Sequence, residues 1–301
     1  MQRTFAGLVA VSVLNSLFAA LSVGCGEGEL PDVPSRLPPE GGPYRVAVAA
    51  QTGSVAGRCR LVGEANPARL RAWPAMGTEE GQDDESVAKG SEHALGGCIV
   101  SLAGIESGKD WPEVMRSDER SITLSVQPGR YEPHLGWVRV GTQLAVRSIL
   151  PTSSTYVRVY DSRGTTLANF SISDGETISP GAAFLDHPGL VHVTEDARHA
   201  FNAWILVSSH PYVEITRADE SAGRAAGAYR LDGLPVGDYE VVCRHEPMDR
   251  GVSLIEGRFA GYVTGPSIEL RRRVRIRSGE TVTADFELRA PAHPSEPESG
   301  K

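Results

Sequence analysis

Four cysteines have the widest range of chemistry in this sequence, because a thiolate can bind a metal, act as a nucleophile or join a disulfide. They are Cys25, Cys59, Cys98 and Cys243. No two of the last three have the short Cys-x-x-Cys spacing that is typical of zinc and redox sites. Outside the cytosol, three cysteines allow one disulfide and one spare thiol. Three small, buried, apolar side chains are the simpler interpretation.

A second candidate for chemistry is the pair His192 and Glu195, which has the His-x-x-Glu spacing of zinc ligands in metallocarboxypeptidases. The match is short and the chain lacks an α/β catalytic domain, so we expect no zinc catalysis. The other histidines of this region show no convergent spacing; they are His134, His187, His199 and His210. The sequence also lacks a Gly-x-Ser-x-Gly elbow and a phosphate-binding loop. We predict no catalytic residue, no metal and no cofactor.

A basic stripe is predicted where four arginines alternate along one strand and therefore share a face. They are Arg271, Arg273, Arg275 and Arg277. Such a stripe can bind anionic lipid or polysaccharide. It can equally be a charged outer face that discourages pairing with another sheet edge, and we favour this second interpretation. Trp73 and Trp111 fall in predicted loops and are candidates for stacking on sugars.

The first 25 residues have the pattern of an export signal. Arg3 precedes a run without charge, from Thr4 to Gly24, that is rich in Leu, Val and Ala. Cys25 and the polar, proline-rich segment after it make the pattern similar to a bacterial lipoprotein signal, in which the cysteine is lipidated. Ser22 departs from it, since Leu, Val or Ile usually stands there. Ordinary secretion and a retained membrane anchor therefore stay open as alternatives.

Short strands separated by turns must position these residues. The 301 residues include 33 glycines and 20 prolines, and long stretches of helical periodicity are absent. Alternating apolar residues predict a first β region over 46–62, a compact strand over 98–102 and a dense series of strands over 122–207. A last β region is predicted over 212–288, so the fold class is all-β.

The segment Tyr229–His245 contains the pattern Tyr-Arg-Leu-x-Gly-Leu-Pro-x-Gly-x-Tyr-x-Val. It resembles the carboxypeptidase regulatory-like domain, a transthyretin-like β-sandwich of a fold group described as carbohydrate-binding-like. The pattern fits a strand pair in which Tyr229 and Tyr239 pack inside while Pro235 and Gly237 form the turn. The regulatory-like domain is an accessory module of its enzymes, so the resemblance implies no peptidase activity.

Residues 133–147 and 203–212 resemble segments of exported proteins in which such a domain is combined with a cupredoxin-like domain. Blue-copper members use His, Cys, His and a weak Met as ligands. The corresponding positions here hold Ser154, Glu195, Arg198 and Phe201. A shift of one residue brings His199 to the second histidine position, but no shift brings a cysteine nearby. The resemblance therefore implies the fold without its blue-copper site.

Together these observations predict a discontinuous transthyretin-like sandwich with a cupredoxin-like sandwich inserted into it. The segments are a signal peptide (1–25), a tether (26–45), the regulatory-like domain (46–105 and 212–289), the cupredoxin-like domain (106–211) and a disordered tail (290–301). Strand parity places Cys59, Cys98 and Cys243 in one core, and Cys59 and Cys98 are the candidate disulfide, although sequence alone does not fix the pairing. Two tandem domains with a boundary near Tyr212 are the alternative.

The function expected from these features is that of a non-catalytic cell-envelope protein that binds or scaffolds an envelope protein or a polysaccharide. A glycan partner follows from fold analogy alone. A net charge of -8 excludes general nucleic-acid binding, because phosphates require a basic footprint. The lipid anchor would hold the protein to a membrane in the periplasm or at the cell surface. A remodelled cupredoxin-type redox or metal protein is the alternative.

Overall fold

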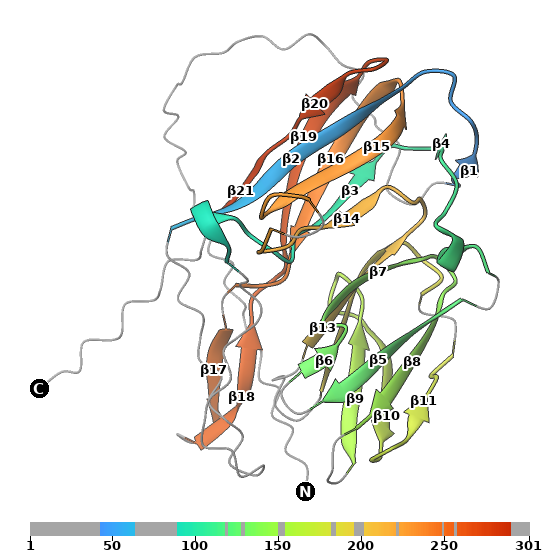
Figure 1. Ribbon diagram of the computed structural model, residues 1–301. Helices are drawn as coiled ribbons and strands as arrows, with labels where there is room; N and C mark the ends of the chain where they lie inside the picture. The colour runs from blue at the N-terminus through green and yellow to red at the C-terminus, as the bar shows by residue number, and fades with distance from the viewer. Residues whose placement is uncertain are drawn as a thin grey trace, which may run out of the picture. The chain divides into compact units, whose positions relative to one another are not determined.

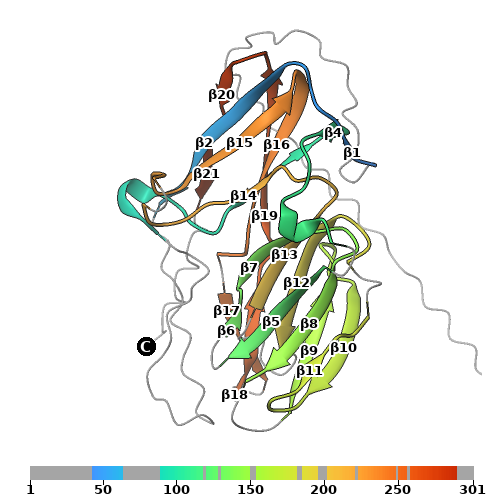
Figure 2. The same cartoon turned by 45° about the vertical axis from the view of Figure 1, so that its right-hand side comes forward.

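The computed structural model describes residues 43–63, 89–117, 120–127, 130–149, 154–181, 185–195, 202–220, 223–248, 250–255 and 258–289. The predicted tether up to residue 42, Cys25, Trp73 and the predicted tail lie outside these residues. The described chain consists of β-strands, connecting segments and two one-turn 3-10 helices, η2 (Ser91–His93) and η3 (Glu113–Met115). The prediction of an all-β, sandwich-type fold is confirmed (Figures 1 and 2). No helix in these ranges is long and apolar enough to cross a membrane.

The first sandwich is built from strands near both ends of the described chain (Figure 1). One sheet has the order β14 (Val213–Ile215), β3 (Ile99–Ala103), β16 (Gly237–His245) and β19 (Ile268–Ile276). The other has the order β15 (Ala228–Pro235), β2 (Thr52–Val62) and β20 (Thr281–Thr283), with β21 (Phe286–Arg289) also paired to β2. Because β3 pairs with both β14 and β16, segments more than 100 residues apart in sequence meet in one sheet.

The second sandwich is formed by the strands that lie in sequence between β4 (Ser107–Gly108) and β14. Its larger sheet has the order β10 (Thr166–Ile172), β9 (Thr155–Tyr160), β12 (Gly189–Glu195), β13 (Asn202–Ser208) and β7 (Leu135–Arg139). Its smaller sheet has the order β11 (Thr177–Ile178), β8 (Gln143–Ser148), β5 (Ser121–Gln127) and β6 (Arg130–Glu132). Alternating residues of both sheets, such as Leu124, Val146 and Val193, share one buried cluster.

Two small pairs of strands complete the described fold. β1 (Arg45–Val46) runs parallel to β4 (Ser107–Gly108). β17 (Arg250–Ile255) and β18 (Arg258–Thr264) form an antiparallel hairpin that follows β16 in sequence.

The core of the first sandwich follows from the alternation along its strands. On β16, Tyr239, Val241 and Cys243 point to one side and belong to the buried cluster that joins the two sheets. On β2, Val55, Cys59 and Leu61 point toward them. The intervening even-numbered residues of β2 face outward, so this strand presents one apolar face and one polar face. That division places the cysteines and the outward arginines of β2 on opposite sides of the same sheet.

Candidate functional site

Three cysteines meet in the core of the first sandwich. Cys59 comes from β2, Cys98 stands directly before β3, and Cys243 comes from β16; all three side chains are completely buried. The three sulfur atoms lie within 4.8 Å of one another, and Sγ of Cys59 is 3.7 Å from Sγ of Cys243. Since β2 belongs to one sheet and β16 to the other, this cysteine cluster bridges the interior of the sandwich.

Strand register explains why the cysteines converge. Cys243 stands opposite Val100 in the ladder between β16 and β3, and Cys98 precedes Val100 by two residues. Residues two apart in extended chain share a face, so Cys98 and Cys243 point the same way. All three thiols are free. No disulfide joins Cys59 to Cys98 in the structure, and the 3.7 Å separation of Cys59 and Cys243 is far longer than an S–S bond of about 2.05 Å.

His245 lies next to this cluster and has one unused nitrogen. It follows Cys243 by two residues on β16 and is only 2% exposed. Its Nδ1 is 2.7 Å from the carbonyl oxygen of Glu246, which can only accept, so Nδ1 carries the proton. In the neutral ring Nε2 then offers a lone pair, and it is buried without a hydrogen-bond partner. A Cβ built on Gly97, the neighbour of Cys98, would be 3.7 Å from this Nε2.

The three thiols do not have equal acidity. Burial alone would raise the pKa of Cys98, but hydrogen bonds with the Cys243 and Cys59 thiols, together with His245, hold that pKa well below its ordinary value. The pKa of Cys59 is raised well above its ordinary value by its hydrogen bonds with Cys243 and Cys98 and by burial. The thiol of Cys98 is therefore the one among the three that loses its proton most readily. A sulfur set of this kind is a soft ligand for a metal ion.

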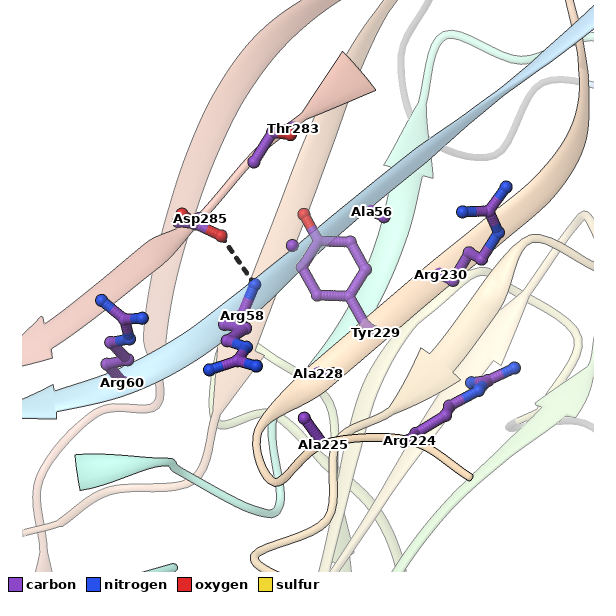
Figure 3. A pocket seen from close by; sticks show the side chains of 11 residues that line it. Ala56, Arg58, Arg60, Arg224, Ala225, Ala228, Tyr229, Arg230, Thr283 and Asp285 are labelled. Atoms are coloured by element: carbon purple, nitrogen blue, oxygen red, sulfur yellow. Dashed lines mark hydrogen bonds between the residues drawn. The ribbon is translucent and has the colours of Figure 1, made fainter. Parts of the chain in front are cut away.

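A second candidate site is a shallow hollow of about 460 Å³ on the outer face of β2 and β15. Figure 3 shows Arg58 and Arg60 on one side of Tyr229, and Arg224 and Arg230 on the other. Between the arginines the lining residues are small; they are Ala56, Gly57, Ala225 and Ala228. The hollow exists because these small side chains leave space between long, basic ones.

The guanidinium groups of this hollow are held loosely by acidic neighbours. Arg58 lies 3.6 Å from Glu92, and both side chains are well exposed. Arg230 lies 2.7 Å from Asp232, and Arg224 pairs with Glu214. Ion pairs in contact with solvent contribute little free energy, about 0–1 kcal/mol each, so an acidic ligand can replace the protein carboxylates.

Asp285 is the acidic residue among the lining side chains and has a structural role (Figure 3). Its carboxylate accepts a hydrogen bond of 2.8 Å from the backbone N–H of Arg58. This bond stands where the pairing of β2 changes from β20 to β21, so the side chain replaces a missing ladder acceptor. The remaining charged side chains of the hollow are positive.

The predicted stripe on β19 is largely neutralised in the structure. Arg271 pairs with Glu240 and Glu269, at 2.7 Å in each case. Arg275 lies 2.6 Å from Asp238, and this ion pair lowers the pKa of Asp238. The fourth member of the stripe, Arg277, lies 3.8 Å from Glu280. With three of the four guanidinium groups matched by carboxylates, the stripe has the character of a charged outer face.

Trp111 does not present its ring to solvent, and its assignment as a sugar-stacking candidate is therefore wrong. The side chain is 4% exposed. Its ring lies 6.4 Å from that of Trp137, and the guanidinium of Arg139 stands 5.1 Å from its centre. The loop that contains it folds back onto these neighbours, which sequence alone could not show. Trp73, the other aromatic candidate, lies outside the described residues.

Two histidines of the second sandwich, His134 and His192, make structural contacts. His192 and Glu195 are three residues apart on β12 and so point to opposite faces. His192 Nε2 is 2.6 Å from Asn202 Oδ1, and its ring stacks on Trp204 at 4.0 Å. His134 Nε2 is 2.6 Å from Glu246 Oε1. This geometry does not bring the pair His192 and Glu195 together as metal ligands.

The copper-ligand positions inferred from the resemblance are described only in part. Ser154 is exposed, and its Oγ is 3.5 Å from that of Ser173. Glu195 is 2% exposed at the end of β12. Arg198, His199 and Phe201 lie outside the described residues.

Sequence reasoning placed the three cysteines in one core but missed the unused nitrogen of His245 and the arginines of the hollow. Arg58 and Arg60 alternate with core residues on β2, which was the available signal for an outward basic face. Only the pairing of β2 with β15 brings Arg230 beside them. No protein-family model matches the chain, and a search of curated proteins finds no significant match.

Proposed function

We propose that this chain is an exported, non-catalytic protein of the cell envelope that binds an acidic polysaccharide in the arginine-lined hollow of the first sandwich. The observation that carries this proposal is the set of four guanidinium groups, of Arg58, Arg60, Arg224 and Arg230, around one shallow depression. Guanidinium groups form planar, bidentate hydrogen bonds with carboxylates. An open hollow suits a polymer that passes across it better than a small molecule that must be enclosed.

The proposed identities of the two sandwiches are consistent with a polysaccharide-binding function. The regulatory-like pattern falls on β15 and β16, where Tyr229 and Tyr239 are buried and Pro235 and Gly237 stand at the turn. This geometry supports a transthyretin-like, carbohydrate-binding-like module for the first sandwich. For the second sandwich we propose a cupredoxin-like module without blue copper, since Ser154 and Glu195 occupy two of the four ligand positions.

The proposed anchor is a lipid on Cys25, which leads to a first prediction. In a Gram-negative host, the wild-type chain should partition into the detergent phase and carry the mass of the attached lipid, because acyl chains dominate membrane affinity. The variant Cys25→Ala should lack the added mass and should no longer partition into the detergent phase as the wild type does. Equal mass and equal partitioning of the two proteins would exclude lipidation at this residue.

Binding to the hollow gives a second prediction, tested with the full chain in detergent micelles. The wild type should bind polygalacturonate, whose sugars carry carboxylates, and should not bind dextran, which is an uncharged polysaccharide. The double variant Arg58→Ala, Arg230→Ala should bind polygalacturonate about tenfold more weakly, since two solvent-exposed ion pairs at up to about 1 kcal/mol each together reach the roughly 1.4 kcal/mol that corresponds to a factor of ten. Isothermal titration calorimetry at two salt concentrations measures both the affinity and its electrostatic part.

The matched control removes the same charge from the other sheet. Arg271→Ala combined with Arg275→Ala deletes two guanidinium groups of β19 and should change the affinity less than about twofold, because long-range charge effects are screened by salt. Equal losses in the two double variants would point to general electrostatic attraction and contradict a site in the hollow. Binding of dextran as tightly as polygalacturonate would also contradict the proposal.

A further inference from the structure

The cysteine cluster and His245 together have the composition of a closed metal site. Cys59, Cys98 and Cys243 place three sulfurs within 4.8 Å of one another at the centre of the first sandwich. In a tetrahedral zinc site each Zn–S bond measures about 2.3 Å, so two sulfurs bound to one ion stand about 3.8 Å apart. The 3.7 Å between the sulfurs of Cys59 and Cys243 agrees with that value.

The imidazole of His245 adds an independent observation. Its Nδ1 is committed to the carbonyl of Glu246 at 2.7 Å, which leaves Nε2 as the lone-pair nitrogen. Metal-binding histidines commonly donate their second ring N–H to a carbonyl in this manner, because the bond fixes the tautomer and the orientation of the ring. A buried nitrogen that lacks any hydrogen-bond partner is costly, and a metal ion would satisfy it.

We propose that Cys59, Cys98, Cys243 and His245 bind one Zn²⁺ ion in a structural Cys3His site that joins the two sheets of the first sandwich. Cys3His is one of the donor sets of closed, structural zinc centres. On binding, each thiol gives up its proton to solvent and bonds as a thiolate, while the neutral imidazole bonds through its Nε2 lone pair. His245 Nε2 lies outside the group of sulfurs that stand within 4.8 Å of one another, so binding of the ion would have to draw this nitrogen and the sulfurs closer together.

Burial on all sides favours a structural role over catalysis. The three cysteines are 0% exposed and His245 is 2% exposed, so neither water nor substrate has an open coordination position. The ligands come from β2, β16 and the residue before β3. An ion at this point therefore ties together chain segments that are distant in sequence, and it does so on the opposite side of β2 from the arginine-lined hollow. This zinc site does not depend on the proposed function of the hollow.

A third prediction tests the site with Zn²⁺ alone. The full chain in detergent micelles, purified with a reductant, should bind about one zinc ion per chain, measured by mass spectrometry of the metal content. Co²⁺ in place of Zn²⁺ should give the intense visible absorption of a tetrahedral thiolate complex. The variants Cys59→Ser, Cys98→Ser and Cys243→Ser should each lose more than about 100-fold in zinc affinity, and His245→Ala should lose about 10–100-fold.

Two controls separate metal binding from folding. Val241→Thr changes a buried residue on the same face of β16 and should keep full zinc binding, as should Cys25→Ala. Circular dichroism identifies variants that still fold, and in these the added Zn²⁺ should raise the melting temperature of the wild type but not of the cysteine variants. Where a variant does not fold, the test uses the wild type alone. Bound Zn²⁺ should slow the alkylation of Cys59, Cys98 and Cys243 in the wild-type chain, compared with the same chain without zinc.

Three results would overturn the proposal. The first is a reduced wild-type chain that takes up no Zn²⁺ and gives no cobalt–thiolate absorption. The second is a disulfide between two of the three cysteines in native material that carries no zinc. The third is an equal loss of zinc from Val241→Thr and Cys98→Ser, which would make the effect one of core packing.

Discussion

Replacing Gly57 with valine is expected to destabilise the first sandwich by about 3 kcal/mol, because the new side chain would overlap a neighbouring strand segment. A Cβ on Gly57 would collide with the carbonyl oxygen of Ala284 and stand 3.0 Å from Cε1 of Tyr229. The backbone of Ala284 cannot move away easily, since its N–H donates to the carbonyl of Ala56 at 2.9 Å. Its carbonyl oxygen also accepts a hydrogen bond from the hydroxyl of Tyr229.

Ala56→Val is the matched control for this prediction. It adds a branched side chain to the same strand, but on the outer face where the hollow leaves space. Valine is favourable in strands, so intrinsic propensity cannot explain a loss at Gly57. Denaturant unfolding followed by circular dichroism should show a change below about 1 kcal/mol for Ala56→Val. Equal stability of the two variants would show that the segment between β20 and β21 does not run as close beside β2 at Gly57 as the structure places it.

Strand β3 shows that the sequence predicts where a strand lies better than it predicts which of its faces are buried. Alternation predicted a strand over 98–102, and β3 spans Ile99–Ala103. Every residue of β3 is buried, including Ser101, although the alternation indicated one inner and one outer face. The reason is that its second face is also covered, which is a property of packing rather than of the local pattern.

Arg244 shows that the burial of a charged residue also cannot be read from the local pattern. By strand parity Arg244 belongs to the face of β16 opposite Val241 and Cys243, which a local pattern would assign to solvent. The arginine is nonetheless only 6% exposed, with its Nε 2.9 Å from Glu269 and its Nη1 3.0 Å from Ser101 Oγ. A buried cation requires such partners, and they stand on β19 and β3. Partners on distant strands are invisible to a local pattern.

The two candidate sites differ in how much of each could be predicted from the sequence. Strand parity was sufficient to place Cys59, Cys98 and Cys243 in one core, because each belongs to an apolar face. A spacing test for zinc cannot find the proposed site, because it looks for ligands close together in sequence, whereas Cys59 and Cys243 are 184 residues apart. The arginine-lined hollow depends on the register that sets Arg230 opposite Ala56, and no local pattern fixes that register.

Acidification is expected to remove about 3 kcal/mol of stability through His210 alone. Burial lowers the pKa of this histidine from 6.5 to about 4, and its hydrogen bond with the carbonyl of Leu102 opposes that shift only in part. The nearby charges of Arg244 and Lys109 lower the pKa further. Nε2 donates to Leu102 O at 2.8 Å, and Nδ1 accepts from the backbone N–H of Tyr212 at 3.3 Å. Both nitrogens are therefore satisfied in the neutral ring.

The sign of the effect follows from proton binding in the two states. Below pH 6.5 the unfolded chain protonates His210, whereas the folded chain does so only as the pH falls toward 4. The unfolded state then binds more protons, so stability is full above pH 6.5 and declines down to about pH 4. A proton on Nδ1 would also face the N–H of Tyr212, where no acceptor stands.

The test compares the wild type with His210→Gln, whose amide can still donate to Leu102 but does not titrate. Acidic residues such as Glu269, whose pKa is lowered despite burial by its neighbours Arg244 and Arg271, contribute equally to both proteins. Between pH 7 and pH 4 the wild type should therefore lose about 3 kcal/mol more than the variant in denaturant unfolding. The variant His187→Gln, at an exposed position, should follow the wild-type curve. An NMR titration of the His210 ring with a midpoint above pH 6 would contradict the prediction, because it would show that the folded state accepts the proton as readily as the unfolded chain.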